Sequence, residues 1–216
     1  MTHLLLSFRR NRFIVAFFQS CFALWGVIKS RSTSSFSPNW IKRKFLIDLI
    51  IKYQIVQFIE TGTYLGQTCG LIARRYPKMH IDTVEIDETL FNDLQRRKVS
   101  KLPNITFWRG DSRFVLKEVL RLPVAGRTLF WLDGHFSMGI TSSGLLETPL
   151  HHELEIIGDS MGRFGQDYII VIDDQKEIDN NPNYPSTDFL ESFAESHRLS
   201  IVKFRNMLVL KPLVLI

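Results

Sequence analysis

Cysteine is scarce in this sequence, and its scarcity excludes whole classes of protein. The 216 residues include two cysteines, Cys21 and Cys69, which form neither a Cys-x-x-Cys pair nor a zinc-ligand spacing. A disulfide framework and a cysteine-based zinc site are therefore excluded. The same shortage favours a reducing compartment, and we expect a cytoplasmic protein.

The sequence also lacks an apolar run long enough to span a membrane with ease. Residues 13–28 form an apolar run that is interrupted by Gln19 and Ser20. As a helix this run would be about 24 Å long, shorter than the roughly 30 Å hydrocarbon core of a bilayer. We favour a helix that packs on the domain or lies on a membrane surface, with peripheral contact through residues 1–31. A membrane anchor and a signal peptide remain alternatives, although no small-x-small cleavage site follows.

The composition is that of a folded protein with a basic front segment. Hydrophobic residues make up 45% of the chain and charged residues 23%, which is more apolar than a disordered chain. The net charge is +5 at pH 7 and the pI is near 9.3. Much of this positive charge comes from Arg9, Arg10, Arg12, Lys29, Arg31, Lys42, Arg43 and Lys44. We therefore assign it to the front segment more than to the domain.

From residue 40 onward, helical and strand-like segments alternate. The strand candidates are 55–60, 81–86, 104–109, 127–133 and 167–173. The segments between them carry helical apolar spacing behind residues that suit N-caps, which predicts an α/β fold with a parallel sheet and helices on both faces. After Pro185, a helix precedes two strands joined at "RN", which predicts an antiparallel last pair. We divide the chain into a basic, apolar segment 1–38 and an α/β domain 39–216.

The first two predicted strands end in acids and glycines. The first strand runs into "ETGTYLG", where Gly62 and Gly66 suit a turn that lets a ligand approach the backbone. A dinucleotide fingerprint would need glycine in place of Tyr64, so an NAD enzyme is disfavoured. The second strand ends at Glu85, where a carboxylate can accept both ribose hydroxyls of a nucleoside.

Acids also end the later strands. Asp111 follows the third strand, where it either receives an adenine amino group or caps the next helix. Asp133 follows the fourth strand, and Asp173 with Asp174 follows the fifth. Carboxylates that converge at one edge of the sheet repel one another and need a positive partner. That partner is a divalent ion, a sulfonium, or a lysine or arginine of the chain itself.

Three histidines follow the fourth strand. His135 lies two residues after Asp133, where it could act as a base near neutral pH or as a metal ligand. A hydrogen-bonded loop histidine is the alternative. For His151 and His152, the leucine and isoleucine spacing around them already explains a helix and favours a structural role.

Together these motifs resemble those of class I S-adenosylmethionine-dependent methyltransferases. The chain from about residue 38 carries "ETGTYLGQT", "VEID", "GDS", "LFWLDGHFSMGITSSGLLETPLHHELEII", "VIDD" and "YPS", a set similar to that of a bacterial group with this fold. The resemblance implies a Rossmann-like, doubly wound sheet of seven strands whose last strand is antiparallel. Met138 stands where the group usually has glycine, and the first forty residues lie outside the resemblance.

The resemblance implies that S-adenosylmethionine binds at the strand ends, with its ribose on Glu85 and its adenine near Asp111. The residues implied to bind this cofactor are Glu60, Gly62, Thr63, Tyr64, Gly66, Thr68, Glu85, Asp111, Ser112 and Asp133. Asp133, Asp173 and Asp174 are also similar to the aspartates that bind magnesium in sugar O-methyltransferases of the macrocin type. There the ion orients and acidifies a hydroxyl.

The predicted reaction is methyl transfer to a hydroxyl of a small molecule or glycan, with Asp133 and His135 as catalytic residues and Mg²⁺ as a candidate second cofactor. A metal-dependent hydrolase using the same aspartates and a catalytically silent adapter are the alternatives. No nucleic-acid partner is expected, because no Asn/Asp-Pro-Pro-aromatic motif follows the fourth strand. Acceptor choice is expected to depend on the loops 136–148 and 175–186.

Overall fold

The computed structural model of the chain describes residues 39–121, 126–134, 148–164, 168–173 and 175–213. The predictions for segment 1–38, including the apolar run at 13–28 and its membrane contact, lie outside these residues. Within the described ranges, no helix is both long enough and apolar enough to cross a membrane.

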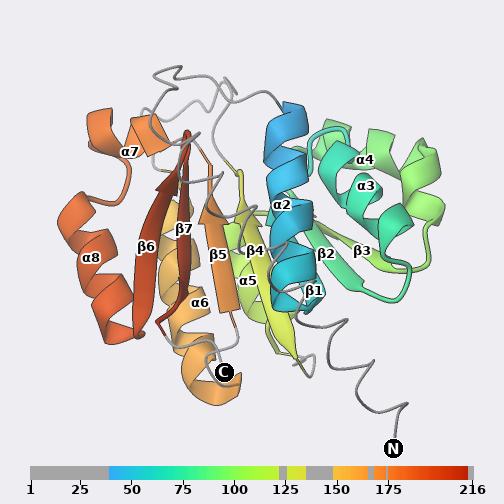
Figure 1. Cartoon of the computed structure of the whole chain (residues 1–216). Coiled ribbons are helices and arrows are strands. Elements are labelled where there is room, and N and C mark those ends of the chain that lie inside the picture. Colours follow the sequence, from blue (N-terminus) through green and yellow to red (C-terminus); the bar gives the residue numbers. More distant parts are fainter. Residues whose placement is uncertain (1–38, 122–125, 135–147, 165–167, 174, 214–216) are drawn as a thin grey trace, which may run out of the picture. The chain divides into compact units, whose positions relative to one another are not determined.

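The described residues build one seven-stranded sheet, in the order β3-β2-β1-β4-β5-β7-β6 (Figure 1). Its strands are β1 (Ile55–Thr61), β2 (His80–Glu85), β3 (Ile105–Arg109), β4 (Arg127–Leu132), β5 (Tyr168–Ile172), β6 (Leu199–Phe204) and β7 (Met207–Pro212). Strands β1 to β5 pair in parallel, whereas β7 is antiparallel to both of its neighbours. The predicted fold class is confirmed, and so is the antiparallel last pair, which turns at Arg205 and Asn206.

Helices cover both faces of the sheet (Figure 1). They are α2 (Asn39–Tyr53), α3 (Gln67–Arg75), α4 (Glu88–Arg96), α5 (Ser112–Val119), α6 (Leu150–Phe164), α7 (Gln175–Asn180) and α8 (Thr187–Ser196), with a short 3-10 helix η1 at Lys98–Lys101. Helices α2, α3 and α4 lie on one face, and α5 and α6 lie on the other. The side chains of Asp87, Asp111 and Ser186 cap α4, α5 and α8, as their positions before apolar helical segments predict.

The core between the sheet and helices α5, α6 and α8 fixes which way the strand ends point. Phe130 and Leu132 of β4 and Ile170 and Ile172 of β5 are fully buried there. Successive side chains of a strand point to opposite faces, so the residue after Leu132 and the residue after Ile172 point toward the α2 and α3 face. The strand order reverses between β1 and β4, and ligands of open α/β sheets bind outside the carboxyl ends of the strands at such a reversal.

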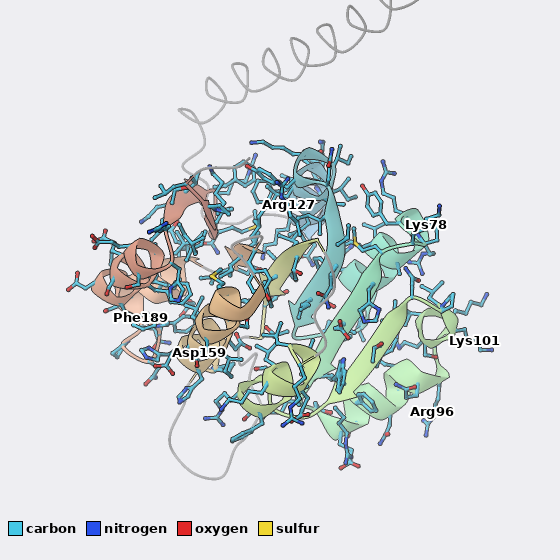
Figure 2. The ribbon with its side chains drawn as sticks, turned by 90° about the horizontal axis from the view of Figure 1, so that it is seen from below. Lys78, Arg96, Lys101, Arg127, Asp159 and Phe189 are labelled. Atoms are coloured by element: carbon cyan, nitrogen blue, oxygen red, sulfur yellow. The ribbon has the colours of Figure 1, made fainter. Side chains whose placement is uncertain are left out.

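Positive residues gather at the opposite edge. Lys78 and Lys101 precede β2 and β3, and Arg127 begins β4, near the amino ends of these strands (Figure 2). Glu60, Glu85, Asp111, Asp133 and Asp173, which were named from the sequence, lie at or just after the carboxyl ends of the strands. The carboxyl edge is therefore the candidate site.

Candidate functional site

The register of the sheet places three carboxylates side by side on the α2 and α3 face. The backbone N–H of Asp133 donates to the Thr61 carbonyl, and that of Asp173 donates to the Leu132 carbonyl, both at 3.1 Å. The ladder thus continues one residue past β4 and β5, and the two aspartates are neighbours. Glu60 pairs with Trp131, two residues before Asp133, so its side chain points to the same face. Sequence reasoning placed these acids on one edge, and the structure brings them together.

A lysine of α2 supplies positive charge to this cluster. The Lys42 ammonium forms an ion pair with Asp173 Oδ2, and the two side chains are only 15% and 2% exposed. Burial raises the pKa of Asp133 well above its ordinary value, and the negative charge of Asp173 raises it further, whereas the Lys42 charge acts in the opposite direction. The chain's own lysine, one of the three positive partners considered from the sequence, is therefore present.

Arg43, the next residue of α2, lies over the start of α3. Its Nη2 donates to Gln67 Oε1 at 2.6 Å and its Nε to Thr68 Oγ1 at 3.4 Å. Sequence reasoning missed Lys42 and Arg43, because it counted them with the basic front segment. Their position in the amphipathic stretch directly before the first strand could have indicated that they belong to the domain.

Glu60 lies beneath these cations in a buried hydrogen-bonded chain. Thr83 Oγ1 donates to Glu60 Oε2 at 2.7 Å, and Thr63 Oγ1 lies 2.7 Å from Thr83 Oγ1. Because the single Thr83 hydroxyl proton goes to Glu60, Thr63 is the donor to Thr83. Burial raises the pKa of Glu60 to about 7, although the Thr83 hydrogen bond and the charge of Arg43 lower it. Thr63 and Glu60 therefore hold the loop after β1 onto β2.

That loop depends on left-handed backbone conformations. Gly62 has φ +87°, and a Cβ there would lie 2.6 Å from the carbonyl oxygen of Asp133. Gly66 has φ +68° and Tyr64 has φ 49°. Tyr64 thus takes a conformation that glycine adopts at less cost. Gly62 lets the ends of β1 and β4 approach each other closely, which brings the loop next to Asp133.

Glu85 is anchored by backbone donors at the end of β2. The N–H of Tyr64 donates to Glu85 Oε2 at 2.7 Å, and the N–H of Asp87 donates to Oε1 at 2.9 Å. Each carboxylate oxygen has two acceptor sites, so both oxygens keep one for a ligand. The glycine-containing loop and the acid are therefore parts of one structure.

Large apolar side chains are exposed after the carboxyl ends of β1, β2 and β3. Tyr64 is 61% exposed, Ile86 57% and Phe114 69%. They follow the carboxyl ends of β1, β2 and β3. Three exposed large apolar side chains thus follow three neighbouring strand ends. The sequence placed Ile86 inside the second strand, whereas the strand ends at Glu85 and leaves Ile86 outside the sheet.

Asp111 acts as the N-cap of α5. Its Oδ1 accepts the Arg113 backbone N–H at 2.9 Å, and its Oδ2 accepts two bonds from the Arg113 guanidinium at 2.9 and 2.6 Å. Burial by itself would raise the pKa of Asp111, but these bonds and the Arg113 charge lower it overall. The cap, one of the two roles considered from the sequence, is present. The adenine contact of Asp111 and the buried Ser112 stays a prediction.

A further buried acid lies on the other face of the sheet. Glu153 of α6 is 1% exposed, and burial raises its pKa to about 7 while Ser112 lowers it. Its Oε1 and the Thr61 hydroxyl have no hydrogen-bond partner among the described residues. Both atoms lie near Gly134, because a Cβ on Gly134 would be 3.6 Å from Glu153 Oε1 and 3.3 Å from Thr61 Oγ1. Glu153 lies in the "HHELEII" segment, whose apolar spacing predicts a helix but no buried acid.

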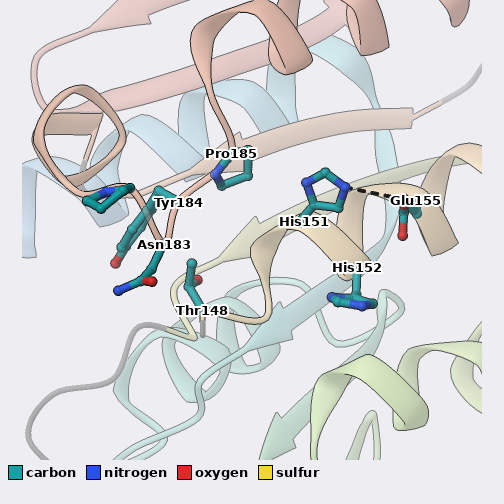
Figure 3. A pocket seen from close by; sticks show the side chains of 8 residues that line it. Thr148, His151, His152, Glu155, Asn183, Tyr184 and Pro185 are labelled. Atoms are coloured by element: carbon teal, nitrogen blue, oxygen red, sulfur yellow. Dashed lines mark ion pairs between the residues drawn. The ribbon is translucent and has the colours of Figure 1, made fainter. Parts of the chain in front are cut away.

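A polar pocket of about 430 Å³ lies between the start of α6 and the loop before α8 (Figure 3). Its lining residues are Thr148, His151, His152, Glu155, Pro182, Asn183, Tyr184 and Pro185. His151 Nε2 lies 3.3 Å from Glu155 Oε1, and its ring stacks on Phe189 with 4.0 Å between centroids. Both histidines thus lie on a pocket wall, and the structural role that the sequence favours for them stays a prediction.

Two predicted site residues lie outside the described residues, namely His135 and Asp174. Among the residues that are described, no three histidine, cysteine, aspartate or glutamate side chains are grouped to hold a metal ion. The magnesium site at Asp133, Asp173 and Asp174 stays a prediction.

Comparison with solved structures shows what fold this is. A Staphylococcus aureus protein assigned as a caffeoyl-CoA O-methyltransferase superposes with a TM-score of 0.57 at 11% identity, covering 88% of this chain and 97% of that one. The fold is that of the Rossmann-like methyltransferases. The methyltransferase PaMTH1 from Podospora anserina, bound to SAH, has a TM-score of 0.56 at 14% identity and covers 87% of this chain and 85% of its own.

A third similar structure is the O-methyltransferase TomG from Streptomyces achromogenes in complex with SAM. Its TM-score is 0.54 at 14% identity, with 82% of each chain covered. No protein-family model matches this sequence. A search of curated proteins gives no match either. At these identities the likeness shows the fold alone, so the activity must be argued from the site.

Proposed function

We propose that the protein is an S-adenosylmethionine-dependent O-methyltransferase that acts on a hydroxyl of a small molecule or sugar. The observation that carries this proposal is the Glu85 carboxylate, held by the N–H groups of Tyr64 and Asp87 at the end of β2. In this fold a carboxylate at that position can accept the two hydroxyls of a ribose. The exposed side chains beside it suit the apolar faces of an adenine ring.

The cofactor would extend from Glu85 across the loop after β1. Ile86 and Phe114 would flank the adenine, and the Gly62–Gly66 turn would let the methionine part approach the backbone. Arg43 lies at the start of α3, where it can pair with the methionine carboxylate. The sulfonium would then lie near Asp133, at the carboxyl end of β4. Bound S-adenosylmethionine supplies an activated methyl group.

Methyl transfer is an in-line displacement, so the protein mainly has to align the acceptor oxygen with the methyl group and exclude water. We propose that the pocket between α6 and the 182–185 loop binds the acceptor. Its lining includes histidine, glutamate, asparagine and tyrosine side chains, which suit a ligand rich in hydroxyls. His135 follows Asp133 by two residues, and we propose that it acts there as the base.

Calorimetry with the wild-type protein tests the proposal. We expect S-adenosylmethionine to release heat of binding and NAD to release none, with or without Mg²⁺. Glu85→Ala should weaken binding of S-adenosylmethionine by about 1.5–3 kcal/mol, which is roughly 10- to 150-fold, because charge-assisted hydrogen bonds are lost. Thermal melts would confirm that the variant is folded.

Glu88→Ala is the matched control, because Glu88 is an exposed acid three residues away that pairs with Arg109 at 2.6 Å. It should bind the cofactor like the wild type. If folded Glu85→Ala binds S-adenosylmethionine as tightly as the wild type does, the ribose assignment is wrong. Binding of NAD instead would overturn the proposed cofactor.

A further inference from the structure

We propose that the Lys42 ammonium takes the cation position of the acidic cluster, so that Asp133 and Asp173 are not available to a divalent metal. The inference rests on the proposed function only where it describes how this cluster acts on an acceptor hydroxyl. The placement of the charge itself follows from contacts in the structure. Lys42 would then supply the positive charge of a metal-independent site.

The donor set does not suit a hard divalent ion. Such ions take about six or more oxygen ligands, usually with several carboxylates or waters free to reach them. Asp173 is 1% exposed, and its Oδ2 already accepts the Lys42 ammonium. A metal on this carboxylate would have to lie next to a fixed positive charge and displace it. The repulsion between the two positive charges opposes metal binding.

Packing of α2 holds Lys42 in place. Three residues along, Phe45 stacks on Phe204 of β6 with 4.3 Å between ring centroids, and Leu46 is fully buried. The Lys42 side chain itself is only 15% exposed, unlike the neighbouring Lys44, whose side chain is 65% exposed. The ammonium is thus part of the folded domain and not a mobile surface charge.

The ammonium can perform the electrostatic part of a metal's role. Its positive charge offsets the negative charge of Asp173, with which it forms an ion pair. The Lys42 ammonium has three N–H donors. While one of them pairs with Asp173, another can donate to an acceptor oxygen at the same edge. A negative charge that develops on this oxygen would be stabilised there.

Binding of Mn²⁺, followed by the electron paramagnetic resonance signal of the free ion, tests the inference on the full chain. We expect no Mn²⁺ binding by the wild type that depends on Asp173. Lys42→Met removes the charge but keeps a long side chain, and it leaves two buried carboxylates without compensation. This variant should bind Mn²⁺ at least tenfold more tightly than the wild type, and a second change, Asp173→Asn, should abolish the gain.

Two control variants complete the design. Lys44→Met changes an exposed lysine of the same helix that pairs with Asp48 at 2.7 Å, and it should leave Mn²⁺ binding unchanged. Lys42→Arg keeps the positive charge and should gain no metal site. If the wild type binds Mn²⁺ and the Asp173→Asn variant does not, the inference is overturned. This comparison does not require any Lys42 variant to fold. A folded Lys42→Met that gains no Mn²⁺ site would also overturn it.

Cofactor binding, measured on the same samples, separates this inference from the proposed function. In one outcome the wild type binds neither Mn²⁺ nor S-adenosylmethionine, and Lys42→Met gains Mn²⁺ binding. This outcome would contradict the proposed function and support the placement of the Lys42 charge. Wild type that binds both ligands, with Mn²⁺ dependent on Asp173, would support the function and contradict the inference.

Discussion

Glu153→Gln is expected to make the protein more stable at alkaline pH and to change its stability little at acidic pH. Glu153 is a carboxylic acid buried on the α5 and α6 face, 1% exposed, with one oxygen unpartnered among the described residues. Glutamine has almost the same shape and cannot ionise. Its amide can also donate to the Thr61 hydroxyl, which has no described partner.

The magnitude follows from the pKa. Burial raises the pKa of Glu153 from its ordinary value of 4.5 to about 7. The folded protein therefore holds a proton that the unfolded chain releases above pH 4.5, and stability falls as pH rises from about 4.5 to about 7. At about 1.4 kcal/mol per pKa unit, ionised Glu153 costs about 3 kcal/mol above pH 7. Glutamine avoids this cost.

Urea unfolding at pH 5 and pH 8 measures the effect. Glu153→Gln should exceed the wild type by less than about 1 kcal/mol at pH 5 and by about 3 kcal/mol at pH 8. Glu60 titrates in the same range, so both proteins keep some pH dependence, and the difference between them isolates Glu153. Glu155→Gln, an exposed acid two residues away, should show no such difference. A Glu153→Gln variant with the wild-type pH dependence would refute the assignment of a buried, protonated acid.

Two further predictions concern the loop after β1. Gly62→Ala should destabilise the protein by about 2 kcal/mol or more in urea unfolding, because its Cβ would lie 2.6 Å from the Asp133 carbonyl oxygen and its φ is +87°. A loss below about 0.5 kcal/mol would show that the ends of β1 and β4 are not held this closely. Tyr64→Gly should keep or raise stability by up to about 1 kcal/mol, because Tyr64 is 61% exposed at φ 49°. A clear drop in its thermal midpoint would indicate that the Tyr64 ring packs in the loop.

The strands were predictable because each is a short apolar run that ends at a polar residue. Candidate 127–133 differs from β4 by one residue, and candidate 167–173 differs from β5 by one residue at each end. Parallel strands end at one edge, so the positions of Asp133, Asp173 and Glu85 also followed from the pattern. Ile86 was assigned to the second strand because it is apolar, and apolarity alone does not distinguish a core residue from one in a ligand site.

The burial of charged side chains was not predictable in the same way. Glu153 lies in the first turn of α6, where an acid is expected for the helix dipole alone. Only the sheet beneath α6 makes it a buried group. Lys42 also looks like a solvent-facing residue of an amphipathic helix, and its ion pair joins residues that are 131 positions apart. Local periodicity carries no information about such a contact.

Lys42 and Arg43 belong to the acidic site and not to the basic front segment of the chain. Glu60, Glu85, Asp133 and Asp173 converge at one edge, and burial raises the pKa of Glu60 and Asp133. Helix α2 places Lys42 on Asp173 and Arg43 beside Glu60, so two positive charges counted with the front segment compensate the acids of the site. Both lie in the first turns of the helix that begins at Asn39. The predicted boundary between front segment and domain therefore lies only a few residues before the first positive charge that the site requires.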